Sequence, residues 1–247
     1  MTRLRSVAPV DDGGDDLRAA LRLDPDSGLI WLHEHRMLLV HAEAQALLRK
    51  ELIDSLGMER AQGLLMRMGY ASGARDAELA RTTAQRSSDV DAFMTGPRLH
   101  TLEGIVRVQP VAIEIDRAGG HFRAEFVWQH SWEGEWHRHF YGTHSEPVCW
   151  TQIGYACGYA SAFMGRPILF VETECVGMGH AVCRIVGKPV EDWPDAERHM
   201  RFFTRESIAD QLLELQTQVG ALRSTIDAQR LLGTDMIGSS PGFRAAC

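Results

Sequence analysis

Three cysteines and one glutamate in the second half of the chain carry side chains that bind metal ions. Cys175 and Cys183 flank a glycine-rich turn at residues 177–179, so a hairpin would bring both thiolates to the same end of two paired strands. Cys149 lies upstream at the start of a predicted helix, and Glu172 lies three residues before Cys175. Three thiolates and one carboxylate, with no position left for water, match a closed tetrahedral structural zinc site.

The spacing of these residues leaves other interpretations open. No two of the five cysteines form a Cys-x-x-Cys pair, and free cysteine is among the residue types most often buried in a core. Glu174 is an alternative ligand to Glu172 that strand parity does not exclude. Cys157 and Cys247 have no evident partners. The residues alone therefore predict either a zinc site or a set of buried thiols.

A histidine and a tryptophan form the second candidate site. His100 closes a predicted helix, and Trp128 ends the apolar face of a predicted strand. A neutral imidazole accepts a proton from a hydroxyl while an indole N–H only donates, so the two can hold one phenolic hydroxyl together. Five aromatic residues are candidates for the wall of such a small-ligand pocket: Phe93, Phe126, Tyr155, Tyr159 and Phe170. The alternative is that His100 is a core histidine with its hydrogen bonds satisfied internally.

Motifs for other kinds of chemistry are weak or missing. The sequence has no Gly-x-x-x-x-Gly-Lys-Ser/Thr loop, and no serine lies in an evident triad context. His137, His139 and His144 lack the i, i+4 spacing of a metal-binding pair and lie among Trp, Arg and Glu residues. This pattern predicts a solvated or edge segment. We therefore expect that the chain is not an enzyme.

Composition and charge limit the classes of protein further. The chain has 247 residues, is 45% hydrophobic and carries a formal charge of −7 without a long Lys/Arg block, which argues against direct DNA contact. It contains no apolar run of the ~18 to 20 residues that span a bilayer, and its N-terminus lacks a signal peptide. Five cysteines are an odd number, as is common for free or metal-binding thiols in a reducing compartment. We expect a cytoplasmic protein without a membrane contact.

The first half of the chain reads as a hairpin followed by helices. Two apolar bursts between residues 28 and 41 predict the hairpin. Apolar residues at helical spacing predict helices over 42–56 and over 58–81, and a third helix leads to Gly96 and Pro97. These elements are expected to position His100.

The second half reads as a sheet with one long helix. Residues 102–131 predict two strands around a Gly119-Gly120 turn, with a bulge or edge at Pro110 where the apolar parity changes. A helix is predicted over 146–164, and two further strands over 167–174 and 181–188. Helix and strands together would place the candidate metal ligands.

The region from Thr204 to Leu232 changes character. Its apolar residues follow a 4-3-4-3-4 spacing, which is the a/d seam of a coiled coil: Ile208, Leu212, Leu215, Val219, Leu222 and Ile226. Two such helices would pair across subunits. The alternative is a single helix that packs on its own domain.

Several segments together resemble one known family. These are residues 28–32 (GLIWL), 69–73 (GYASG), 96–100 (GPRLH), 172–183 (ETECVGMGHAVC) and 237–244 (IGSSPGFR). The chain resembles the sensory domains of aromatic-responsive, sigma-54-dependent, NtrC-like regulators of the XylR, DmpR, MopR and PoxR group. The fourth segment resembles the zinc-binding end of their vinyl-4-reductase-type module, and the last resembles the start of their AAA+ ATPase domain.

The resemblance implies a function and its site residues. It implies Zn²⁺ on Cys149, Glu172, Cys175 and Cys183, and phenol or a simple substituted phenol on His100 and Trp128. Effector binding would relieve inhibition of a downstream AAA+ ATPase, which acts on sigma-54 RNA polymerase. Alternatives are a hydrocarbon effector such as toluene, benzene or xylene, or a vinyl-reductase-type enzyme, for which no redox cofactor site is evident.

The expected fold class is α+β in five parts. A disordered tail (1–16) precedes a hairpin-and-helix subdomain (17–87) that makes homodimer contacts. The ligand-binding sheet-and-helix subdomain with structural zinc (88–200) comes next, followed by a helical linker (201–236). Residues 237–247 would begin a truncated AAA+ domain.

Overall fold

Alternating apolar and polar residues form β5, a central strand of a four-stranded antiparallel sheet. The computed structural model describes residues 17–83, 88–205 and 208–234. The strand order in the sheet is β4-β5-β7-β6, and the bounds are Arg107–Asp116 (β4), His121–Gln129 (β5), Ile168–Glu174 (β6) and Cys183–Pro189 (β7). Every second side chain of β5 is buried, from Phe122 to Trp128. The predicted apolar face of this strand is confirmed.

Two irregularities in the sheet change which side chains face the core. The β4–β5 register shifts between Pro110 and Ala112, which confirms the bulge predicted at Pro110. The β6–β7 register shifts between Glu172 and Glu174. Glu172 is buried as a result, whereas Glu174 lies outside the core and contacts Arg184.

A small antiparallel sheet precedes the helices. Its strands, in the order β1-β2-β3, are Leu21–Asp24 (β1), Leu29–Leu32 (β2) and His35–Met37 (β3). The predicted hairpin is confirmed as β2 and β3, but strand β1 was missed. The second apolar burst was assigned to a strand, and this was wrong beyond Met37, because residues 38–40 have no strand structure and are exposed.

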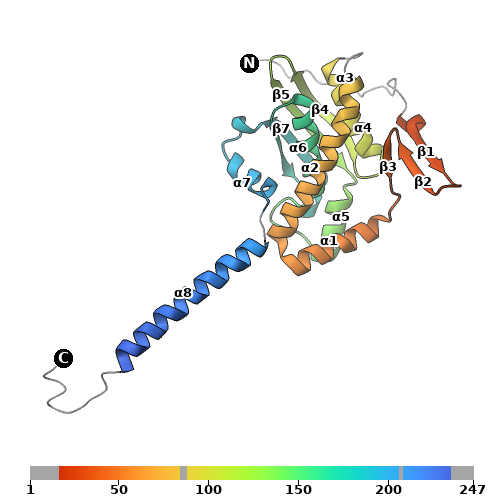
Figure 1. Ribbon diagram of the computed structural model, residues 1–247. Coiled ribbons are helices and arrows are strands. Elements are labelled where there is room, and N and C mark those ends of the chain that lie inside the picture. Colours follow the sequence, from red (N-terminus) through yellow and green to blue (C-terminus); the bar gives the residue numbers. More distant parts are fainter. Residues whose placement is uncertain (1–16, 84–87, 206–207, 235–247) are drawn as a thin grey trace, which may run out of the picture. The chain divides into compact units, whose positions relative to one another are not determined.

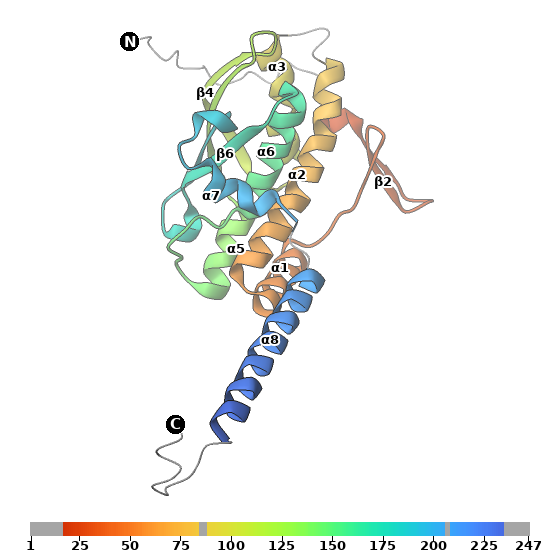
Figure 2. The same cartoon turned by 60° about the vertical axis from the view of Figure 1, so that its left-hand side comes forward.

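The helices form two further layers on the large sheet. Their bounds are Ala42–Leu56 (α1), Met58–Thr83 (α2), Asp89–Phe93 (α3), Thr95–Leu102 (α4), Trp132–Tyr141 (α5), Trp150–Met164 (α6) and Ala196–Met200 (α7). Helix α6 is buried over almost its whole length. It lies between the sheet and α2, which both Figure 1 and Figure 2 show. This helix therefore connects the sheet to the N-terminal helices.

Glycines allow α2 and α6 to approach closely. A Cβ atom at Gly69 or Gly73 would overlap a backbone carbonyl oxygen of α6, and one at Gly154 or Gly158 would overlap a carbonyl oxygen of α2. The two glycines of each helix follow an i, i+4 spacing, so they lie on one face of that helix. The close approach brings α2 next to Tyr155, one of the predicted pocket residues.

Helix α5 corrects one prediction. The stretch around His137 was expected to be solvated or at an edge, yet it forms a helix in which the His137 side chain is fully buried. His139 on the same helix is exposed, as expected. A histidine count over this stretch does not show which ring faces inward, because that depends on the partners of the helix.

The chain divides into two compact units at Thr204 and Arg205. The boundary predicted at residues 87 and 88 within the first unit stays a prediction. The second unit contains helix α8, Ile208–Thr234, on which Leu215, Val219, Leu222 and Ile226 are exposed. The predicted tail 1–16, the predicted ATPase start 237–247 and Cys247 lie outside the described residues. Within the described ranges, no helix is both long and apolar enough to cross a membrane.

Candidate functional site

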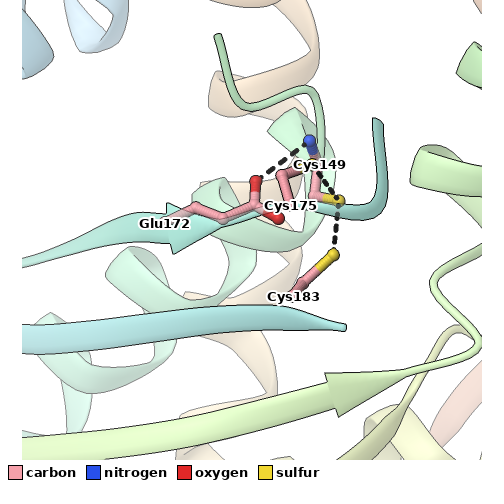
Figure 3. Close-up of side chains that lie close together, drawn as sticks. All are labelled: Cys149, Glu172, Cys175 and Cys183. Atoms are coloured by element: carbon pink, nitrogen blue, oxygen red, sulfur yellow. Dashed lines mark hydrogen bonds between the residues drawn. The ribbon is translucent and has the colours of Figure 1, made fainter. Parts of the chain in front are cut away.

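The four predicted metal ligands meet at one end of the large sheet. Cys149 immediately precedes α6, Glu172 lies on β6, Cys175 follows β6, and Cys183 begins β7. Figure 3 shows the four side chains pointing toward one another. All four residues are buried, and their ligand atoms lie within 4.8 Å of one another. The structure thus selects Glu172 over the alternative Glu174.

The distances between the sulfur atoms fit a tetrahedral metal centre. The Sγ atom of Cys149 lies 3.8 Å from that of Cys175 and 3.7 Å from that of Cys183. Zn–S bonds of about 2.3 Å at tetrahedral angles would separate two sulfur atoms by about 3.8 Å. Disulfides need sulfur atoms about 2.0 Å apart. The thiols are therefore spaced for a shared metal ion.

Charge and hydrogen bonding at the cluster also favour a cation. Burial raises the pKa of the Cys149 thiol and of the Glu172 carboxyl well above their usual values, because desolvation penalises an anion. One carboxylate oxygen of Glu172 is buried without a hydrogen-bond partner among the described residues, while the other accepts from the Cys149 backbone N–H at 3.3 Å. A bound dication would satisfy the first oxygen and stabilise the charged form of all four groups.

A buried ionic network that the sequence interpretation missed supports the start of α6. The guanidinium of Arg49 on α1 contacts Glu133 at 3.4 Å and His137 Nδ1 at 3.0 Å. Glu133 accepts from the backbone N–H of Gln152 at 3.1 Å, so its carboxylate caps the helix that Cys149 precedes. All three network side chains are almost completely buried. Their long sequence separations left no local signal.

The predicted pocket residues surround a single cavity. His100, Trp128 and the aromatic residues Phe93, Phe126, Tyr155, Tyr159 and Phe170 all line it. Four further residues of its wall were not predicted: Pro97, Val108, Ala156 and Ile185. The centre of a water molecule can move through about 30 Å³ of this cavity, so an occupant larger than one ring would have to displace the wall. The wall is mostly apolar.

Two polar groups on this wall are available to an occupant. The Tyr159 hydroxyl donates to the Phe93 carbonyl at 2.8 Å, and the Tyr155 hydroxyl donates to Asp76 at 2.9 Å. Among the described residues, none hydrogen-bonds to the His100 ring or to the indole nitrogen of Trp128. Both side chains are nevertheless almost completely buried. Buried polar groups normally have partners, so these two are free for a ligand.

The imidazole of His100 is neutral at physiological pH. Burial lowers the pKa of His100 to about 3, since desolvation penalises the imidazolium. A neutral ring has one nitrogen that accepts a hydrogen bond, whereas the Trp128 indole N–H only donates. The pair therefore complements a group that both donates and accepts, such as a hydroxyl.

Comparisons with known proteins agree with this arrangement. Residues 16–116 match a family described as "Activator of aromatic catabolism", and residues 128–189 match the vinyl-4-reductase-type domain. Over 235 residues the chain is 42% identical to the transcriptional regulatory protein XylR of Pseudomonas putida and 36% identical to the phenol regulator MopR of Acinetobacter guillouiae. These matches cover 94% of this chain and 41% and 42% of the relatives.

A solved structure is also similar. The crystal structure of the phenol-responsive sensory domain of the transcription activator PoxR, with phenol, is 52% identical, with a TM-score of 0.75. The match covers 77% of this chain and 95% of that one. The fold and the two sites thus define a sensory domain of a transcriptional regulator. The chain belongs to the XylR/MopR/PoxR family of activators of aromatic catabolism, and it spans about two-fifths of the length of the curated relatives it matches.

Proposed function

We propose that this chain senses phenol or a simple substituted phenol, which it binds in the cavity between His100 and Trp128. The observation that carries the proposal is the pair of unengaged polar groups on an otherwise apolar wall, one an acceptor and the other a donor. One phenolic hydroxyl satisfies both, and its ring packs against the aromatic residues. The phenol-bound PoxR domain supports the same effector class.

Calorimetry with phenol and toluene on one preparation of the 247-residue chain tests the proposal. The two ligands have similar rings, but only phenol offers a hydroxyl to the two buried polar groups. Leaving them unpaired costs about 1 to 3 kcal/mol, so phenol should bind roughly ten- to a hundredfold more tightly than toluene. Equal or tighter binding of toluene would overturn the phenolic assignment.

A hydrocarbon effector such as toluene, benzene or xylene is the second candidate. It is favoured by the wall itself, where Phe93, Phe126 and Phe170 present only apolar surface. A hydrocarbon would leave His100 and Trp128 without partners, which is the physical reason for ranking it second. The same calorimetric comparison decides between the two.

The cysteine and glutamate cluster is proposed to hold a structural Zn²⁺ ion. Cys149, Glu172, Cys175 and Cys183 supply four ligands, so no position remains open for a water molecule or a substrate. The ion would join the start of α6 to the β6–β7 turn. Because α6 also carries Tyr155 and Tyr159, the metal stabilises one wall of the effector cavity.

The regulatory part of the proposal concerns the region outside this chain. Effector binding relieves inhibition of a downstream AAA+ ATPase, which then acts on sigma-54 RNA polymerase at genes for aromatic catabolism. The full-length relatives, more than twice as long as this chain, leave room for such a domain. Phenol-dependent ATP hydrolysis by a full-length protein is the test, and hydrolysis that phenol does not change would contradict it.

The functional form is proposed to be a homodimer. Leu38 and Leu39 are 77% and 87% exposed, and Leu47 and Leu48 on α1 are 51% and 56% exposed. A group of large exposed apolar side chains is typical of an interaction surface. The apolar seam of α8 offers a second contact between subunits. Sedimentation of the chain at micromolar concentration tests this, and a monomer would contradict it.

A further inference from the structure

Tyr155 contacts the effector cavity on one side and a carboxylate on the other. Its ring stacks on the His100 imidazole, with 3.7 Å between ring centroids and 27° between the planes. Its hydroxyl donates to Oδ2 of Asp76 on α2 at 2.9 Å. The Tyr155 side chain thus links the group that is to accept the effector hydroxyl with an acidic residue outside the cavity wall.

Asp76 is held in place from two further directions. His35 Nδ1 on strand β3 lies 3.5 Å from its other carboxylate oxygen. Gly73, one turn earlier on α2, lies so close to the Tyr155 backbone carbonyl that no side chain fits there. The Asp76 carboxylate is therefore held at a fixed distance from Tyr155, and its side chain is only 15% exposed.

The His100 ring needs such support. Within the described part of the chain, its nitrogens make no hydrogen bond, so its orientation depends on packing, and stacking on Tyr155 is the closest ring contact. A hydrogen bond to an effector hydroxyl weakens steeply when the ring turns out of alignment. A Tyr155 ring free to tilt would therefore weaken that hydrogen bond without removing any cavity residue.

We infer that Asp76 is a positioning residue for effector selection: through the Tyr155 hydroxyl it fixes the ring on which His100 stacks, and so aligns His100 with the effector hydroxyl. The inference rests on the proposed function. It predicts that Asp76, which does not line the cavity, affects ligands with a hydroxyl and leaves ligands without one unaffected.

Calorimetry with phenol and toluene on Asp76→Ala and Tyr155→Phe tests this, with circular dichroism to confirm the fold of each variant. Both changes should weaken phenol binding at least fivefold and change toluene binding less than twofold. Asp76→Asn should restore phenol binding to within about twofold of wild type, because its amide oxygen still accepts from the tyrosine. The double variant should lose no more than the more strongly affected single variant, since both changes break one interaction.

Asp54→Ala is the matched control. Asp54 accepts from the Tyr141 hydroxyl at 2.8 Å, so it forms the same kind of pair, and neither residue lines the cavity. Its loss should leave the ratio of phenol to toluene affinity unchanged. NMR signals of the His100 imidazole give a second readout, which phenol should shift less in Tyr155→Phe than in wild type.

Three results would overturn the inference or its basis. Unchanged phenol affinity in Asp76→Ala and Tyr155→Phe would show that His100 is aligned without them. Equal losses of phenol and toluene binding would show that Asp76 only stabilises the packing of α2 on α6. A wild-type chain that does not bind phenol would overturn the proposed function, and the inference with it.

Discussion

The cysteine cluster and the aromatic cavity share helix α6 but select their ligands by opposite means. In the cluster, every side chain that faces the centre is a potential ligand, and sulfur atoms 3.7 and 3.8 Å apart match one coordination geometry. In the cavity, most of the wall is apolar, and two polar side chains face the space. The first site is suited to a tightly held structural ion. The second is suited to a ligand that exchanges and is recognised by one functional group.

The largest expected effect is on the cluster. Cys183→Ser should abolish metal binding and lower the free energy of unfolding by about 4 kcal/mol or more, since the metal joins elements that are distant in sequence. Elemental analysis and thermal unfolding measure the two changes. Cys157→Ser is the control, because Cys157 is buried but contacts the Phe170 backbone and not the cluster. Its metal content should stay at the wild-type value. Chelation that strips the metal without changing unfolding or phenol affinity would contradict a structural role.

The cavity should respond with a smaller and more selective change. His100→Ala removes the acceptor of the effector hydroxyl, so phenol binding should weaken by about 1 to 3 kcal/mol, or roughly ten- to a hundredfold. Toluene, which has no hydroxyl, should lose little affinity and can gain from the added space. Trp128→Phe should show a milder version, because it keeps most of the ring. Equal losses for both ligands in a folded His100→Ala variant would make His100 a packing residue.

The cavity should also respond to pH differently from an exposed histidine. Burial lowers the pKa of His100 to about 3, so phenol affinity should stay constant from about pH 8 down to about pH 5, below the ordinary histidine value of ~6.5. Between about pH 6.5 and pH 3 the unfolded chain binds a proton that the folded chain does not. His100 therefore lowers the stability of the fold as pH falls through this window. Calorimetry and urea unfolding across this range measure both, and a loss of affinity centred near the ordinary histidine pKa would contradict the neutral, buried ring.

The smallest expected effect on either site comes from the α8 seam. Leu215→Asp and Leu222→Asp place charge on exposed apolar positions of this helix, which should weaken helix pairing. Sedimentation should show dissociation of the dimer, or a higher dissociation constant, while metal content and phenol affinity stay at wild-type values. Leu213, also exposed, lies off the seam, so Leu213→Asp is the matched control. Unchanged association in both seam variants would mean that α8 does not pair.

The sequence by itself determined the parts of the fold that repeat locally. Alternation from Phe122 to Trp128 identified β5 because side chains in a strand point to opposite faces in turn. The parity change at Pro110 identified the bulge, and heptad spacing identified α8 as a helix. Residue types and the family resemblance also singled out the cluster residues and the pocket residues, and the structure gathers each set around one centre. Their roles in binding stay predictions.

Only the tertiary structure decided which polar groups are buried and which groups they contact. It chose Glu172 over Glu174 through a register shift between β6 and β7, which no side-chain pattern reveals. Burial of His137 depends on Arg49, 88 residues away in sequence, and the link from Asp76 to Tyr155 spans 79 residues. Such pairs form when two helices pack in one particular register. Local propensity carries no information about that register, because for α2 and α6 it is set by the close contact of their glycines.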